Sequence, residues 1–208
     1  HIPAAIALVV VLLAALYAGY LNRTVYVQAE RASVLYKVNL IRAKLEGNIN
    51  ANIQLVRGLV ATMSTEPDMN QARFAQLAEN LFREETQLRN IAGAPDLVIS
   101  MQYPMAGNER AIGLDYRSDP VQRGAALKAQ QSGELVLAGP VELRQGGQAF
   151  IGRFPVFVRD GARATFWGIV SAVIDVERLY HDSGLLDPDL GIEVALSGKD
   201  ATGSAGAQ

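Results

Sequence analysis

The sequence predicts an α+β domain that follows a membrane-spanning helix. Three observations lead to this prediction: an uncharged apolar run at residues 2–21, a helical periodicity that continues without proline to residue 63, and two long strand-like segments joined by a hairpin signal. Helices that come before antiparallel strands are typical of α+β domains, in which helices cover one face of an antiparallel sheet. We therefore expect an antiparallel sheet with its helices on one face.

The composition excludes several classes of protein. The 208 residues carry a net charge of −2, no cysteine, and two histidines, His1 and His181, far apart in the chain. Thiolate metal sites, disulfides and cysteine nucleophiles are thereby excluded, and the balanced charge lacks the basic footprint of a nucleic-acid-binding protein. Ser100, Ser132 and Ser171 lie outside a Gly-x-Ser-x-Gly setting. We expect no catalytic residues, no metal, no cofactor and no nucleic-acid partner.

Residues 2–21 form the first expected element, a transmembrane helix. About 20 uncharged residues at 1.5 Å each cross the ~30 Å hydrocarbon core of a bilayer. A signal peptide has an apolar core of only about 7–15 residues, so we interpret the run as a retained span. Tyr17 and Tyr20 lie near its end and Arg23 follows, as is typical of a membrane interface.

A long helix is expected over residues 22–63. Its apolar residues recur every three or four positions and form one stripe: Val34, Val38, Ile41, Leu45, Ile49, Ile53, Val56, Val60 and Met63. The stripe has two interpretations that can hold along different lengths of the helix. It packs on the protein's own domain, or it pairs with a second copy to form a parallel homodimer.

Three shorter helices are expected in the rest of the chain. Asn70 is a suitable N-cap for a helix to about residue 85, and Asp119 is a suitable N-cap for a helix that begins at Pro120 and ends near residue 131. Another helix is expected at residues 176–183.

Strands are expected between and after these helices. The Asp160-Gly161 dipeptide predicts a tight hairpin between the two longest strands. The expected strands are residues 97–103, 111–114, 134–137, 149–158, 165–174 and 192–196.

Strand alternation makes Arg153 informative. It places Phe150, Gly152 and Phe154 on one face of the sheet and Ile151 and Arg153 on the other. A glycine between two phenylalanines leaves a hollow with aromatic walls. Either this face is ordinary core with Arg153 in solvent, or the hollow holds a ligand under a helix. Gly168 is the equivalent small residue on the next strand.

Several blocks in order resemble the CHASE domain, the extracytoplasmic sensor of bacterial transmembrane receptors and plant cytokinin-receptor histidine kinases. The blocks are residues 103–116, 132–141, 146–150, 154–158 and 166–175. The resemblance implies a membrane-distal PAS-like domain, here residues 64–175, and a membrane-proximal PAS-like domain that starts at residues 176–208. It also implies a second membrane span and a cytoplasmic output, either a histidine kinase or a diguanylate cyclase or phosphodiesterase.

Matching to the family also implies the ligand site. In cytokinin receptors an aspartate near the start of the helix before the Ser/Thr-Gly turn binds the purine, and the matching residue here is Gln122. This neutral amide makes cytokinin itself a poor match. The other pocket positions that the resemblance implies are Ala138, Leu143, Phe150 and Phe154.

These observations predict a receptor rather than an enzyme. We expect a periplasmic sensor domain, held in the bacterial inner membrane, that binds a small molecule between the helix after Asp119 and the strand that carries Phe150 and Phe154. Replacing Phe154 or Gln122 by alanine is then expected to abolish the response in a folded domain. The alternative is a ligand-independent membrane scaffold that only holds two copies together.

Overall fold

The computed structural model describes residues 2–83, 86–143, 146–161 and 163–196. The chain divides into two compact units, His1–Ala43 and Lys44–Gln208. Helix α1, Ile2–Thr65, begins in the first unit and ends in the second.

The first unit lies on α1, and many of its described apolar side chains are exposed. Val10, Leu13, Leu16, Tyr17 and Tyr20 all have more than half of their surface accessible. Within the described part of the chain, α1 is the one helix long and apolar enough to cross a membrane. Apolar side chains on every side of a helix fit a lipid environment, as expected for residues 2–21.

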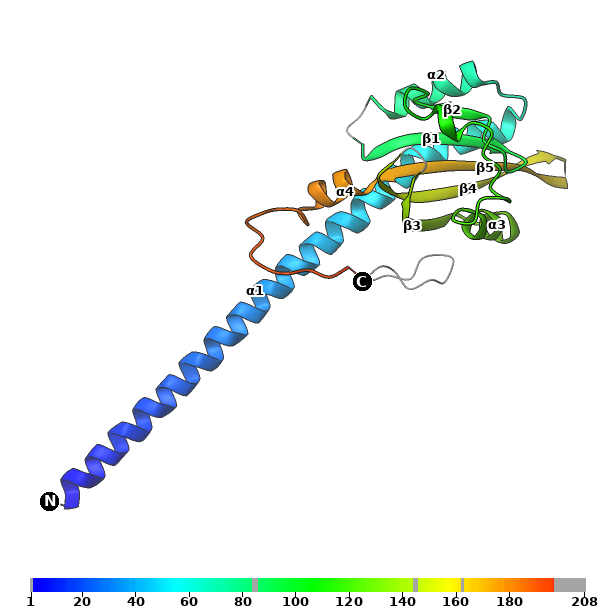
Figure 1. Cartoon of the computed structure of the whole chain (residues 1–208). Coiled ribbons are helices and arrows are strands. Elements are labelled where there is room, and N and C mark those ends of the chain that lie inside the picture. The colour runs from blue at the N-terminus through cyan, green and yellow to red at the C-terminus, as the bar shows by residue number, and fades with distance from the viewer. Residues whose placement is uncertain (1, 84–85, 144–145, 162, 197–208) are drawn as a thin grey trace. The chain divides into compact units, whose positions relative to one another are not determined.

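The second unit is built around a five-stranded antiparallel sheet with the strand order β2-β1-β5-β4-β3 (Figure 1). Its elements follow the end of α1 in the order α2 (Gln71–Leu81), β1 (Leu88–Pro95), β2 (Met101–Tyr103), the 3-10 turn η1 (Glu109–Ala111), α3 (Arg123–Ser132), β3 (Val136–Glu142), β4 (Gln148–Asp160), β5 (Arg163–Asp175) and α4 (Val176–Ser183).

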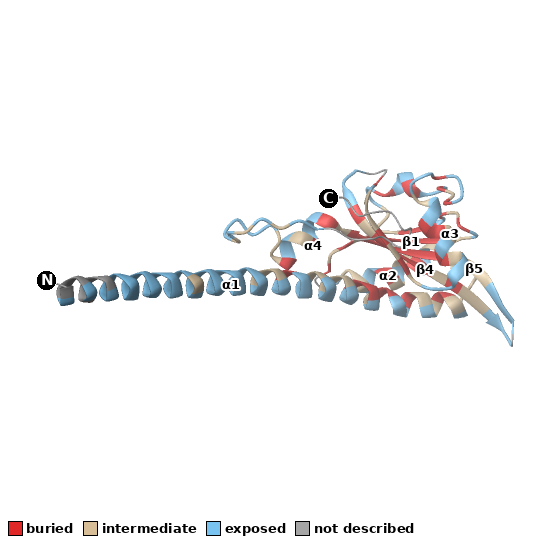
Figure 2. Ribbon diagram, turned by 90° about the horizontal axis from the view of Figure 1, so that it is seen from below, coloured by how far each residue is buried: buried red, intermediate tan, exposed pale blue. Residues whose placement is uncertain are grey.

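Helices cover both faces of this sheet, so the expectation of helices on one face was wrong. One face packs on α1, α2 and α4 through Val56, Phe74 and Leu179. The other face packs on α3, whose Ala125, Ala126 and Ala129 are buried. Buried residues accordingly concentrate on the sheet and on the helices against it (Figure 2). The end of α1 thus packs on its own domain, which is one of the two interpretations of its apolar stripe.

The caps and the hairpin agree with the sequence. The side chain of Asn70 accepts a hydrogen bond from the backbone N–H of Arg73 at the start of α2. Asp175 caps α4 in the same way, and Asp160 pairs with Arg163 across the hairpin between β4 and β5. Asp119 also caps backbone N–H groups, but the helix that follows begins at Arg123 rather than at Pro120.

Three strand predictions were wrong. Residues 97–100 are not a strand, because Asp96 and Leu97 turn the chain with positive φ angles between β1 and β2. Residues 111–114 begin at the last residue of a 3-10 turn and, although Gly113 and Leu114 form backbone hydrogen bonds with Ile99, are not a strand. Residues 192–196 have no partner strand in the described part of the chain and are irregular. Residues 197–208 lie outside the described residues, so the start of a membrane-proximal domain stays a prediction.

Candidate functional site

The two faces of β4 lie in different environments. Phe154 and Val156 belong to the core under α1 and α2, and Phe150 packs against the same core. Ile151 lies on the opposite face, and Arg153 contacts residues of that face. The alternation predicted from the sequence is therefore present, but the aromatic side faces away from α3.

The expected aromatic hollow is filled by protein. A Cβ built on Gly152 would meet the ring of Phe154 at 3.5 Å and Leu135 at 3.7 Å. Gly168 is a glycine for a different reason, since its φ is +155° and a Cβ there would overlap the carbonyl oxygen of Ala94 on the neighbouring strand. Gly168 thus allows β1 and β5 to approach, and neither glycine opens a ligand site.

A cavity of about 30 Å³ lies on the other face, under α3 and the chain that leads to it. Strands β1, β2, β4 and β5, the end of β3 and the loop between β1 and β2 supply one wall, and the segment between β2 and α3 supplies the other. The lining residues are Asn90, Ala92, Ile99, Gln102, Ala111, Leu114, Tyr116, Gln122, Leu143, Ile151, Ser171 and Val173. The site is thus mainly apolar, with a few polar groups that converge, as ligand sites are.

Arg153 is the charged group beside this cavity, and only 1% of its surface is accessible. Its Nη1 donates to Ser171 Oγ at 3.3 Å and its Nη2 donates to Gln122 Oε1 at 2.9 Å. Its guanidinium carbon lies 4.5 Å from the centre of the Tyr116 ring. Three residues of the cavity wall therefore hold the guanidinium, and all three are uncharged. The expectation of a solvent-exposed Arg153 was wrong.

Four buried polar atoms around the cavity have no hydrogen-bond partner. They are Asn90 Oδ1, Gln102 Oε1, Gln102 Nε2 and Arg153 Nε. A buried polar atom without a partner costs about 1–3 kcal/mol, and such atoms are rare in folded proteins. They are therefore atoms that a bound molecule can satisfy.

The backbone of β2 fixes the position of Gln102. Gln71 on α2 donates from Nε2 to the carbonyl oxygen of Gln102 and accepts at Oε1 from its backbone N–H, both at 2.9 Å. This clamp leaves the side chain of Gln102 free to point toward the α3-side face of the sheet, where it lines the cavity. The side-chain amide is thus positioned through its backbone and makes no hydrogen bond of its own to a described residue.

A pair of charged contacts holds the loop that covers the cavity. Arg117 binds Asp115 at 2.9 Å and Asp96 at 3.3 Å, and Asp96 lies just before the loop residue Ile99 that lines the cavity. Hydrogen bonds from Arg117 hold the pKa of Asp115 below its usual range. These contacts are exposed and so contribute little to stability, whereas the buried side chains of Leu97, Leu114 and Tyr116 and the backbone hydrogen bond from Tyr116 to Leu97 hold the segment in place.

The residues expected from the resemblance fall in three places. Gln122 and Leu143 line the cavity. Ala138 is buried in the core under α3 but does not line the cavity, and Phe150 and Phe154 lie on the far face. The sequence reasoning missed Asn90, Gln102, Tyr116 and Ser171. Arg153 stood out only as a single charge in an apolar strand.

The described residues contain no group of three or more His, Cys, Asp or Glu placed to hold a metal ion. Arg153 is also absent from the ion pairs that join described residues. The chemistry of this site is therefore hydrogen bonding together with one buried positive charge.

Comparison with known families identifies this domain. The family model of the CHASE domain matches residues 50–207, which is well over half of the chain. The chain belongs to the CHASE domain family. The sequence resemblance is thereby confirmed, and so is the α+β fold with a long N-terminal helix that could span a membrane.

Solved structures share the fold of this CHASE domain. An extracellular ligand-binding receptor from Desulfohalobium retbaense is 18% identical with a TM-score of 0.53, and the match covers 70% of this chain and 26% of that one. The sensory domain of the Campylobacter jejuni chemoreceptor Tlp3 with isoleucine bound is 9% identical with a TM-score of 0.52, over 74% and 64% of the two chains. The ligand-binding domain of Tlp3 in complex with L-norvaline is 10% identical with a TM-score of 0.51, and the match covers 74% of this chain and 62% of that one.

The CHASE chain thus spans less than two thirds of each of these structures. A search of the curated proteins finds no match. The family and the fold are those of extracytoplasmic ligand-binding sensor domains.

Proposed function

We propose that this domain is the small-molecule receptor of a transmembrane signalling protein and that the cavity under α3 is its binding site. The unpartnered polar atoms of Asn90, Gln102 and Arg153 support this site most directly, because a bound molecule would supply their hydrogen bonds. Two of the structures with a similar fold hold bound amino acids, isoleucine and norvaline, which supports a small organic molecule as the ligand.

Binding requires the cavity to expand. A volume of about 30 Å³ has room for about two water molecules, whereas small-molecule sites are typically roughly 300–1,000 Å³. Expansion would have to displace the two segments that carry Ile99, Leu114 and Tyr116, which are joined by backbone hydrogen bonds from the N–H of Ile99 to Leu114 and from the N–H of Tyr116 to Leu97. A ligand that binds the open arrangement more tightly shifts the population toward it.

The signal would then cross the membrane. In this proposal residues 2–21 anchor the protein in the bacterial inner membrane, residues 22–63 pair two copies, and the ligand biases the arrangement of that pair. The output would be a cytoplasmic histidine kinase, or a diguanylate cyclase or phosphodiesterase. The family match and the apolar segment of α1 support this reading.

A thermal-shift screen of the whole chain in detergent tests the binding site. Trp167, the one tryptophan in the sequence, reports unfolding. The panel contains neutral, cationic, anionic and zwitterionic metabolites, including isoleucine and norvaline. A ligand at 100 times its Kd stabilises the folded state by about 2.7 kcal/mol, whereas a ligand-independent scaffold shows no shift with any compound.

Two variants localise a positive result. Gln102→Leu should abolish the shift without unfolding the domain, because the amide has no side-chain partner and the clamp from Gln71 holds only the backbone. Gln131→Leu makes the same change at an exposed residue of α3 and should keep the shift. A full response from Gln102→Leu would contradict this site.

A further inference from the structure

The charge beside the cavity restricts the chemistry of its ligand. The neighbours of the Arg153 guanidinium among the described residues are Ser171, Gln122 and Tyr116, which are neutral. Burying a cation without an anion costs several kcal/mol. Arg153 does not itself line the cavity, but all three of these neighbours do, so the described residues leave a positive charge next to the cavity without an anion.

The described carboxylates do not supply the missing charge. Asp119 is the buried carboxylate nearest in sequence to Gln122, and its Oδ1 accepts from the backbone N–H groups of Val121 and Gln122. It does not line the cavity, and the lining contains no Asp or Glu.

We infer that the ligand is a small organic carboxylate without a positively charged group. Its carboxylate would bind Arg153, whose planar guanidinium matches two carboxylate oxygens at once. One oxygen would replace the neutral acceptor Gln122 Oε1, and the unpartnered Nε would become a donor. This inference rests on the proposed receptor function and names the class of its ligand.

The opposite wall suggests a second, uncharged polar group on the ligand. Asn90 offers an unpartnered oxygen, and Gln102 offers an unpartnered oxygen and amide nitrogen. These amides can bond a hydroxyl, carbonyl or amide group. Apolar Ile99, Leu114 and Ile151 line the cavity as well, so the body of the ligand would be apolar.

A zwitterion fits this site less well than a plain acid. A ligand of charge −1 neutralises Arg153, whereas a zwitterionic amino acid brings an ammonium group that finds no carboxylate in the lining. That ammonium would lose hydration against neutral amides only, which costs free energy. The inferred ligand thus differs from the amino acids bound in the similar structures of Tlp3.

Binding measurements with pairs of probes that have nearly the same shape but differ in charge test the inference. The whole chain in detergent is titrated with propionate, lactate, isovalerate and benzoate, and with their primary amides, which have nearly the same shape. At least one acid should bind with a Kd about thirtyfold or more below that of its amide, since loss of a buried charge partner costs about 2 kcal/mol or more. Isovalerate should also bind more tightly than valine, which carries an added ammonium.

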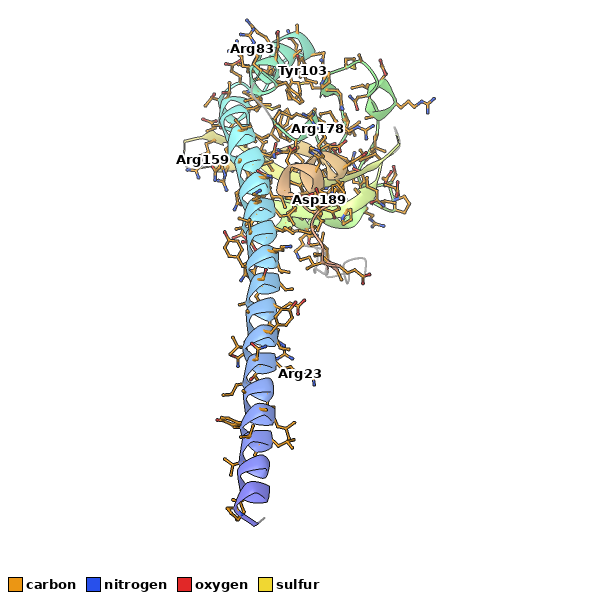
Figure 3. All side chains as sticks on the ribbon, turned by 90° about the vertical axis from the view of Figure 1, so that its left-hand side faces the viewer. Arg23, Arg83, Tyr103, Arg159, Arg178 and Asp189 are labelled. Carbon is orange, nitrogen blue, oxygen red and sulfur yellow. The ribbon has the colours of Figure 1, made fainter. Side chains whose placement is uncertain are left out.

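Substitutions at two arginines of β4 test whether Arg153 causes the preference for acids over amides. Arg153→Gln should remove the difference between acid and amide. Arg159→Gln makes the same change at an exposed residue of β4, labelled in Figure 3, and should preserve the difference. Arg153→Lys keeps the charge without the planar fork and should give an intermediate preference. Should Arg153→Gln fail to fold, Ser171→Ala, which removes one partner of the guanidinium, should still alter the ratio of acid to amide affinity.

The outcomes separate the inference from the function on which it rests. If compounds bind at the cavity but acids and amides bind equally, or valine binds better than isovalerate, the carboxylate inference is overturned and the receptor function stands. If no compound in the wider panel stabilises the protein, both are overturned. An acid preference that Arg153→Gln leaves unchanged also overturns the inference.

Discussion

Neighbouring residues of β4 have opposite roles because a strand alternates its side chains. Arg153 lies beside the cavity and donates to Ser171 and Gln122 of its wall, whereas Phe154 is 5% exposed and packs into the core on the far face. The arginine is unfavourable for stability in isolation, since it is a buried cation. The phenylalanine is favourable for stability and does not line the cavity. The two side chains therefore predict different phenotypes.

We expect Phe154→Ala to destabilise the protein rather than to remove a ligand contact. Truncation of a buried phenylalanine costs about 3–5 kcal/mol. Phe157 on the same strand is only half-buried, against Phe166, so Phe157→Ala should cost less. Denaturant unfolding followed by Trp167 fluorescence measures both. An equal loss in the two variants would show that Phe154 is not in the core.

The candidate site could be predicted only in part from the sequence. Matching to the family indicated Gln122 and Leu143, and alternation separated Arg153 from the phenylalanines. Alternation shows which side chains of a strand share a face, but it does not show which of the two faces carries the cavity. Asn90 was not assigned to a strand at all, and the polarity of Gln102 gave no signal of its position. Their convergence is a property of the folded sheet.

At the scale of elements, the sequence predicted the helices and strands that have strong local patterns. The hairpin of β4 and β5 combines long apolar segments with Asp160-Gly161, and α4 has the cap Asp175. Strand β1 was missed because its end, Gly93-Ala94-Pro95, has poor strand propensity. It forms a strand because β2 and β5 pair with it on both sides, which is a tertiary effect.

A chain of hydrogen bonds connects α1, the start of β1 and α4. Asn52 Nδ2 donates to Gln87 Oε1 at 2.7 Å, and Asn52 Oδ1 accepts from Thr86 at 2.5 Å. Gln87 Nε2 in turn donates to Asp182 Oδ2 at 2.6 Å. Asn90 of the cavity lies on the same strand three residues later. Displacement of β1 by a ligand would therefore act on α1 through Asn52.

The carboxylate at the end of this chain predicts an acid-dependent stability. The hydrogen bond from Gln87 lowers the pKa of Asp182 in the folded state. A lowered pKa means that the ionised group contributes stability above its unfolded value of about 4 and loses that contribution as the pH falls through the folded value. The difference in Tm between the wild type and Asp182→Asn should therefore be constant above about pH 5 and narrow below about pH 4.

The same measurement in the Gln87→Ala variant tests whether Gln87 causes this pH dependence. Gln87→Ala removes the hydrogen-bond donor that lowers the pKa of Asp182. In this background the difference in Tm between the protein with Asp182 and the Asp182→Asn variant should therefore depend less on pH. An unchanged pH dependence in the Gln87→Ala background would show that another group is responsible.

At the scale of the whole molecule, the two interpretations of the α1 stripe concern different lengths of the helix. From Ile53 to Met63 the stripe is buried against the domain's own sheet. Earlier on the stripe Val34 is exposed, and pairing of this length with a second copy stays a prediction. It has a physical reason, because a helix in water tends to bury such residues.

Cysteine crosslinking in liposomes tests the pairing directly. The chain has no cysteine, so each substitution introduces the only thiol. Val34 lies on the stripe, and Tyr36 lies two residues further, about 200° around the helix. Paired copies should crosslink through Val34→Cys on mild oxidation several times faster than through Tyr36→Cys, because a disulfide needs Cα atoms within about 7 Å. Equal rates at the two positions would show that collision, and not a helix pair along this stripe, brings the thiols together.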